Sequence, residues 1–178
     1  MESESFDFIV IGAGSAGCVV ASRLSENGNH SVLLLEAGPE SRSPWIRIPV
    51  GYFKTVFNPQ LNWGFETEPE PELNGRKISW PRGRLVGGTG AINGMVYIRG
   101  QRQDFDDWRS AGNVGWGYDD LLPYFRRSER QAESNRPLES ALHGDHGPIW
   151  VSDYPDRHPL CESFIQAASE LGIPPNSD

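Results

Sequence analysis

Two short apolar runs near the N-terminus, residues 6–11 and 31–36, have the composition of buried parallel strands. Such strands are covered on both faces, so they read as continuous apolar runs and not as alternating patterns. Residues 15–27 between them predict a helix, and Gly28 stands where a glycine commonly ends one. The apolar stripe expected to face the sheet is Val19, Val20 and Leu24. The order predicts a β-α-β unit with a right-handed crossover.

This regular pattern breaks down over residues 39–80, where prolines and tryptophans punctuate the chain. The prolines include those at 44, 49, 59, 69 and 71, and the tryptophans are at 45, 63 and 80. A segment of this length without helix or strand periodicity is typical of a functional lid or insertion. It is followed by a glycine-rich segment, residues 81–100.

The C-terminal half predicts helices separated by polar segments. Residues 105–111 and 118–129 are the first two, and Pro123 is compatible with the second only if it falls in the first turn. Residues 131–147 are polar and predict a surface loop. Residues 160–171 predict a last helix that ends at Gly172, with no strand after it.

Composition narrows the class of protein. The 178 residues suggest one domain with a core, and a net charge of −8 without a basic cluster argues against nucleic-acid binding. No apolar run is long enough for a membrane span, and the acidic N-terminus is unlike a signal peptide. Two cysteines outside any CxxC pattern fit a reduced compartment, and Cys18 reads as a small core residue. We therefore expect a soluble, cytoplasmic protein.

The main candidate for chemistry is the run Gly12-Ala13-Gly14-Ser15-Ala16-Gly17. It follows an expected strand and opens an expected helix, and Glu36 ends the next strand, which is the context of a dinucleotide-binding fingerprint. Gly12 allows the tight turn, Gly14 lets the backbone approach a diphosphate, and Gly17 lets helix and strand pack closely. The helix N-terminus attracts the phosphates. A carboxylate at Glu36 accepts ribose hydroxyls and disfavours the 2′-phosphate of NADP.

Two alternatives stay open at this point. Glycines at this spacing also occur in turns that bind nothing. The fingerprint also does not separate FAD from NAD, because both contain an ADP moiety.

A second glycine-rich block, residues 83–106, resembles a signature of the glucose–methanol–choline (GMC) oxidoreductase family, and the choline dehydrogenase-like members in particular. Its core reads Gly83-Arg-Leu-Val-Gly-Gly-Thr-Gly-Ala-Ile-Asn-Gly-Met-Val-Tyr-Ile-Arg-Gly100. Further similar segments follow the order of the family over essentially the whole chain: residues 34–38, 63–65, 80–83, 122–125 and 143–148.

The resemblance implies an α/β fold: the N-terminal part of a Rossmann-like FAD-binding domain, incomplete, with a long irregular insertion and C-terminal helices. The expected parts are a β-α-β ADP-binding unit at 1–38, a lid or insertion at 39–80, a flavin loop at 81–100 and a helical region at 101–178. FAD is the implied cofactor. The expected cofactor-binding residues are Gly12, Gly14, Ser15, Ala16, Gly17, Glu36, Ala37, Val86, Gly88, Thr89, Asn93, Gly94, Met95 and Val96.

The family resemblance also implies the reaction, hydride transfer from an alcohol to flavin N5. Some members bind flavin covalently through a histidine at the position of Ile92, so FAD is expected to bind here without a covalent bond. The family's catalytic histidine lies in a C-terminal segment that has no counterpart here, so we expect the chain alone to turn over no alcohol. Because a doubly wound sheet with only its first strands leaves apolar faces and strand edges uncovered, we also expect the chain alone to be marginally stable and to bind FAD weakly. No catalytic or metal-binding residue is assigned; His143 and His146 lack further ligands of zinc-like spacing.

Three functions remain in competition. The first is a fragment of an FAD-dependent alcohol dehydrogenase or oxidase. The second is a non-catalytic flavin-binding chain that works only with a complementary partner chain. The third, a nicotinamide-dependent dehydrogenase, is disfavoured by the second glycine-rich block.

Overall fold

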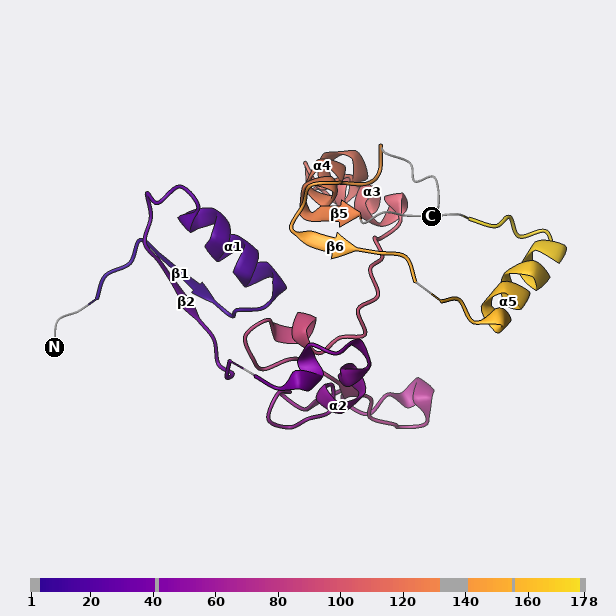
Figure 1. Cartoon of the computed structure of the whole chain (residues 1–178), viewed down its shortest axis with the longest axis horizontal. Coiled ribbons are helices and arrows are strands. Elements are labelled where there is room, and N and C mark those ends of the chain that lie inside the picture. Colours follow the sequence, from indigo (N-terminus) through magenta and orange to yellow (C-terminus); the bar gives the residue numbers. More distant parts are fainter. Residues whose placement is uncertain (1–3, 41, 132–140, 155, 177–178) are drawn as a thin grey trace. The chain divides into compact units, whose positions relative to one another are not determined.

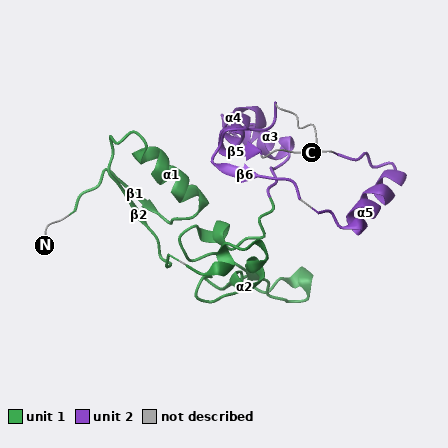
Figure 2. Ribbon diagram, in the orientation of Figure 1, with its two compact units in different colours: residues 1–96 green, residues 97–178 purple. Residues whose placement is uncertain are grey.

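The computed structural model describes residues 4–40, 42–131, 141–154 and 156–176. The chain forms two compact units, residues Met1–Val96 and Tyr97–Asp178 (Figure 2). The boundary between them falls inside the glycine-rich segment 81–100.

Unit 1 begins with the β-α-β element that the sequence predicts. Strand β1 (Phe8–Ile11), helix α1 (Ser15–Ser25) and strand β2 (Val32–Leu35) follow one another, and the two strands pair in parallel (Figure 1). The register places Phe8 opposite Val32 and Ile11 opposite Leu35. Both strands therefore end at the same level, which brings the residues that follow them to one edge of the sheet.

A polar clamp fixes this register where the strands begin. The Ser31 N–H donates to Asp7 Oδ2 over 2.8 Å, and the Asp7 N–H donates to the Ser31 carbonyl over 3.1 Å. The hydrogen bond from the Ser31 backbone holds the pKa of the Asp7 carboxyl below its usual value. At the other end of the strands, the Gly12 N–H donates to the Leu35 carbonyl over 2.7 Å.

The expected inward stripe of α1 is not buried. Val19 is 58% and Val20 48% exposed, Leu24 is half-buried, and no residue of the helix is fully buried. Cys18 is likewise exposed, so its interpretation as a core residue is wrong. The physical reason is that the sheet beside α1 has only two strands, too narrow a surface to cover one face of a helix.

The segment expected to be irregular is organised into short pieces. Helix α2 (Tyr52–Thr55) and a hairpin of β3 (Phe65–Glu66) and β4 (Ser79–Trp80) are its main elements, the strands being antiparallel. Three 3₁₀ turns accompany them, η1 (Pro44–Ile46), η2 (Pro49–Gly51) and η3 (Pro71–Leu73), and a fourth, η4 (Gly88–Ala91), lies in the glycine-rich segment that follows. Prolines begin three of these turns, because a fixed φ suits the first helical position.

The buried core of unit 1 comes from this segment and the glycine-rich one. Leu61, Leu85 and Ile92 are at most 6% exposed and pack together, with Ile46 and Ala91 against them. Ile92 therefore occupies the core as an aliphatic side chain.

Unit 2 contains α3 (Arg102–Ser110), α4 (Tyr118–Ser128) and α5 (Pro159–Glu170). The buried Phe105 of α3 contacts rings of both its own helix and α4, including Phe125 at 5.5 Å between ring centres. Gly172, with φ of 84°, follows the last helix and confirms the predicted stop.

One expectation about unit 2 is wrong. Pro123 is the sixth residue of α4 and not in its first turn. The helix tolerates the lost hydrogen bond because aromatic packing through Phe125 holds it against α3. The loop expected at 131–147 is confirmed over its described residues 141–147, and only Gln131 belongs to a strand, β5 (Glu129–Gln131), which pairs in parallel with β6 (Ile149–Val151). Residues 132–140 lie outside the described residues.

A buried carboxylate joins these elements. Glu129 is fully buried and accepts a charge-assisted hydrogen bond from the Arg99 guanidinium, while the His143 Nδ1 lies 2.7 Å from its other oxygen. Arg99 also donates to the Leu142 carbonyl over 2.6 Å. The first strand of the β5–β6 pair is thereby tied to the segments on both sides of it.

Glu129→Gln is expected to lower the free energy of unfolding of the chain by about 3–5 kcal/mol, because it leaves the Arg99 charge without its carboxylate in a site largely closed to water. Urea unfolding followed by circular dichroism measures this. The control is Glu162→Gln, whose side chain is 56% exposed and should change stability by less than about 0.5 kcal/mol. Equal stability of both variants would contradict the prediction.

Candidate functional site

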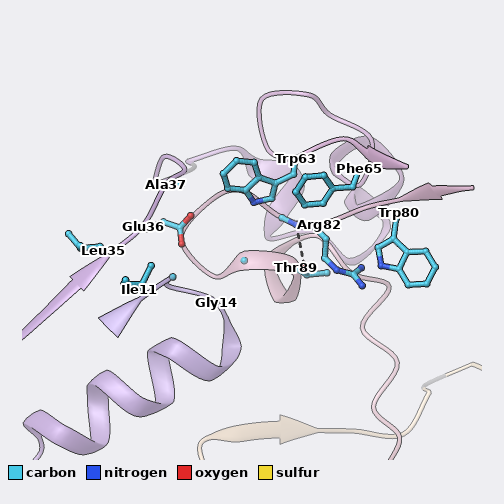
Figure 3. Close-up of a pocket in the computed structure, with 13 residues that line it drawn as sticks. Ile11, Gly14, Leu35, Glu36, Ala37, Trp63, Phe65, Trp80, Arg82 and Thr89 are labelled. Carbon is cyan, nitrogen blue, oxygen red and sulfur yellow. Dashed lines mark hydrogen bonds between the residues drawn. The ribbon is translucent and has the colours of Figure 1, made fainter. Parts of the chain in front are cut away.

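A cavity of ≈ 790 Å³ in unit 1 opens at the carboxyl ends of β1 and β2 (Figure 3). Its lining comes from three segments: the strand ends, the β3–β4 hairpin and the second glycine-rich block. The residues are Ile11, Gly12, Gly14, Leu35, Glu36, Ala37, Trp63, Phe65, Trp80, Arg82, Gly83, Gly88 and Thr89. Ligands of parallel α/β sheets bind outside the carboxyl ends of the strands, so the cavity lies where the fold predicts a ligand.

The first glycine-rich turn has the backbone geometry that its sequence predicts. Gly12 has φ of 95°, a conformation that side chains disfavour. A Cβ on Gly17 would lie 1.8 Å from the Gly12 carbonyl oxygen, so only glycine permits this approach of helix to turn. Gly14 is the N-cap of α1 and supplies no side-chain cap, which leaves first-turn N–H groups for a ligand.

Glu36 ties this turn to the end of β2. One carboxylate oxygen accepts from the Ala13 N–H over 2.8 Å and the other from the Gly38 N–H over 2.9 Å. A carboxylate has about four acceptor positions, so two remain for hydroxyl donors in the cavity. Glu36 thus has a structural task in addition to the ligand contact that the fingerprint implies.

The second glycine-rich block packs directly on the first. The Gly87 N–H donates to the Ala13 carbonyl over 2.8 Å, and a Cβ on Gly88 would lie 2.8 Å from the Gly14 Cα. A Cβ on Gly83 would lie 2.3 Å from the Gly88 carbonyl oxygen. Missing side chains therefore let three backbone segments meet at the floor of the cavity.

Six of the predicted cofactor-binding residues line this cavity: Gly12, Gly14, Glu36, Ala37, Gly88 and Thr89. Ser15, Ala16 and Gly17 form the first turn of α1 behind it, and Val86 is 47% exposed beside it. Their contact with a cofactor stays a prediction.

The predicted group Asn93, Gly94, Met95 and Val96 lies outside the cavity lining. Asn93 Oδ1 accepts from the Met95 N–H over 2.9 Å, and Met95 has a left-handed φ of 58°. Met95 and Val96 are 55% and 83% exposed. The loop therefore exposes two apolar side chains, and its backbone is in a turn with a left-handed residue. Its expected contact with a flavin stays a prediction.

Sequence reasoning assigned no ligand role to the wall that the β3–β4 hairpin contributes. Trp63, Phe65, Trp80 and Arg82 all line the cavity. The sequence singled out residues 63–65 and 80–83 only because they resemble segments of a known family. The alternation of large aromatic and small residues in these segments could have indicated a ligand-binding surface. No periodicity in the sequence, however, places these segments next to the first glycine-rich turn.

Three of the four histidines, His30, His143 and His158, have structural partners. His143 faces Glu129, the His158 side chain caps α5 by accepting from the Leu160 N–H, and the His30 ring stands edge-on to Phe8 at 5.1 Å. Over the described ranges, no group of three or more His, Cys, Asp or Glu side chains is arranged to hold a metal ion. Within the same residues, no helix is both long and apolar enough to cross a membrane.

Comparison with known proteins identifies the class. A family model for the N-terminal part of GMC oxidoreductases matches residues 6–178. The chain belongs to the GMC oxidoreductase family, and it corresponds to the N-terminal FAD-binding region of choline dehydrogenase-like members.

The relatives are much longer than this chain. It is 44% identical to the oxygen-dependent choline dehydrogenase of Vibrio vulnificus, over 98% of the chain and 31% of that protein. It is 42% identical to the mitochondrial choline dehydrogenase of Mus musculus, over 98% of the chain and 30% of that protein. Among solved structures, an FAD-dependent oxidoreductase from Chaetomium thermophilum superimposes with a TM-score of 0.85 at 34% identity, over 98% of the chain and 31% of that structure. The chain thus spans about a third of the relatives it matches.

Glu36→Gln is expected to lower the free energy of unfolding by about 1–2 kcal/mol, because the amide retains one acceptor oxygen and turns an N–H₂ group toward a backbone N–H. Thermal or urea unfolding of the chain without added ligand measures it. The matched control, Glu26→Gln, removes a carboxylate that is 61% exposed and should have little effect. If the Glu36→Gln variant had the same free energy of unfolding as the wild type, the hydrogen bonds of Glu36 to the two backbone N–H groups would not contribute to stability.

Proposed function

We propose that this chain holds FAD for an oxidoreductase that acts on the CH–OH group of an alcohol, choline or another. The observation that carries the proposal is the meeting of a GxGxxG turn, a ribose-type carboxylate and a second glycine-rich block at one cavity. When bound, FAD would supply the hydride acceptor, flavin N5, for the carbon that carries the hydroxyl.

The residues of the cavity fit the adenosine diphosphate part of such a cofactor. Gly14 has open space on the cavity side: a Cβ there would have only the Gly88 Cα within 4 Å, at 3.9 Å. The α1 N-terminus, with no side-chain cap, offers N–H donors to a diphosphate. Glu36 offers its remaining acceptor positions to ribose hydroxyls and repels a 2′-phosphate, which favours FAD or NAD over NADP.

The chain's own contribution is therefore binding and orientation. The alcohol proton needs a base with a pKa near the working pH. We assign that role to none of these histidines, since His143 faces Glu129 and His158 caps α5. Binding of FAD without turnover of alcohol is the expected behaviour of the chain alone, and the base is proposed to come from the remainder of a longer protein.

A second candidate is a non-catalytic flavin-binding chain completed by a separate polypeptide. It is favoured by the apolar side chains that β1 and α1 leave open, Ile9 at 59%, Ile11 at 85% and Val19 at 58% exposure. The two candidates differ in a direct test: detection in source cells with an antibody to this segment gives either one much longer polypeptide or a species of 19.8 kDa that co-purifies with its complement.

Gly14→Ala is expected to abolish measurable FAD binding while leaving the fold intact. The added methyl group meets only ordinary contacts within the chain, yet it occupies the space into which a diphosphate must come. Equilibrium dialysis with FAD and with NAD⁺ measures binding, and thermal unfolding reports on the fold; the wild type should retain FAD in preference to NAD⁺.

The contrasting variant is Gly17→Ala, whose methyl group would overlap the Gly12 carbonyl oxygen and should destabilise the chain itself. Unchanged FAD binding by a folded Gly14→Ala variant would overturn the proposed site. Preference for NAD⁺ in the wild type would overturn the assignment of the cofactor.

A further inference from the structure

Asparagine followed by glycine occurs three times in the chain, at Asn27-Gly28, Asn74-Gly75 and Asn93-Gly94. In such a pair the backbone nitrogen of the glycine can attack the side-chain amide carbon of the asparagine, because the glycine has no Cβ to obstruct the approach. All three pairs are exposed to solvent. The sequence alone does not distinguish them, whereas the structure does.

The attacking N–H groups differ in their hydrogen bonds. The Gly28 N–H donates to the Ser25 carbonyl over 3.0 Å. The Gly75 N–H donates to the Glu70 carbonyl over 3.0 Å. Over the described residues, the Gly94 N–H forms no hydrogen bond, and a Cβ on Gly94 would meet nothing within 4 Å. Attack by Gly28 or Gly75 must first break a hydrogen bond, whereas Gly94 has a free nitrogen and open space around it.

The amide of Asn93 also has a donor at the atom where negative charge develops. Its Oδ1 accepts from the Met95 N–H over 2.9 Å. Attack on the amide carbon turns this oxygen into an oxyanion, and a backbone N–H at about 2.7–3.1 Å from it stabilises the intermediate. Asn27 has a comparable contact with the Asn29 N–H over 3.0 Å, but its glycine nitrogen is engaged. In the part of the chain that the structure describes, no donor reaches the Asn74 side chain.

We propose that Asn93 is a site of spontaneous deamidation, selected by the geometry of the loop at 93–96. The Gly94 nitrogen bonds to the Asn93 side-chain carbon Cγ, and the bond from Cγ to the amide nitrogen breaks. The proton of the Gly94 N–H passes through solvent to the departing group, which leaves as ammonia, and a cyclic succinimide remains. Water then adds to one of the two ring carbonyl carbons and opens the ring, which gives aspartate or isoaspartate.

The conversion changes a loop that is expected to contact the flavin. Both products carry a new carboxylate, and isoaspartate also adds a methylene group to the main chain. Converted chains should therefore lose affinity for FAD. Bound FAD should in turn slow the conversion, because a ligand that orders the loop restricts the motion that brings the Gly94 nitrogen to Cγ. This coupling to the cofactor rests on the proposed function, and the reactivity of Asn93 in the ligand-free chain does not.

The test is a time course of the full chain at mildly alkaline pH without ligand, followed by peptide mass spectrometry and enzymatic labelling of isoaspartate. Cleavage after Arg84 and Arg99 releases a peptide in which Asn93 carries the only side-chain amide. Asn93 should convert several times faster than Asn27 and Asn74. In urea all three should convert at similar rates, because each is followed by glycine and the structural differences are gone.

Gly94→Ala is the matched variant. Its methyl group meets no atom of the folded chain within 4 Å, so the fold should be retained, which thermal unfolding checks. The methyl group hinders the attacking nitrogen, so conversion at Asn93 should be largely lost while Asn27 and Asn74 keep their rates. In a parallel time course of the wild type, saturating FAD should slow the conversion at Asn93 alone.

Equal rates at the three sites of the folded chain, or the same preference in urea, would overturn the deamidation site. The proposed function would be unaffected, since FAD binding by fresh protein is measured separately by equilibrium dialysis. If fresh protein binds FAD and Asn93 still converts at its ligand-free rate, the site stands and its coupling to the cofactor is overturned. Fresh protein that binds no FAD would overturn the proposed function, and the comparison of the three rates would still decide the site.

Discussion

Unit 1 depends on a backbone approach that only missing side chains allow. Gly17 lies against the Gly12 carbonyl, Gly88 against Gly14, and Gly83 against Gly88, each too close for a Cβ. The contact of Gly88 with Gly14 joins the β-α-β element to the second glycine-rich block, and the hydrogen bond from the Gly87 N–H to the Ala13 carbonyl secures the junction. A side chain at Gly88 or Gly83 would push these segments apart and disturb the floor of the cavity, whereas Gly14 has room for a methyl group. The same junction therefore builds the fold and the site.

Glu36 likewise contributes both to the fold and to the candidate site. Its oxygens hold the Ala13 and Gly38 N–H groups, so the carboxylate is oriented before any ribose arrives. A group fixed by the fold loses little conformational freedom on binding, and its affinity is correspondingly higher. The arrangement also means that changes at this carboxylate alter stability and binding together. Variants at Gly14, where the chain has room for a methyl group, separate the two effects.

The sequence predicted what is local and missed what is not. The β-α-β element and the glycine turn followed from short apolar runs and glycine spacing, because β1, α1 and β2 are contiguous. The wall of Trp63, Trp80 and Arg82 could not be placed, since its position depends on contacts with residues distant in the chain. Strand β5 was hidden in a polar segment because it is held by the buried charge of Glu129 and not by apolar residues. The stripe of α1 was identified correctly as apolar, but periodicity cannot state how wide a sheet lies beside it.

Charge sets a constraint on the proposed diphosphate site. The chain carries a net charge of −8, and Glu36 adds a negative charge inside the cavity that would receive a diphosphate. A favourable potential must therefore be local. The α1 N-terminus supplies about half a unit charge at most, which leaves a dianionic group under-compensated beside a carboxylate. Arg82 is the positively charged side chain among the residues that line this cavity, and it lies on the β3–β4 hairpin together with Trp80.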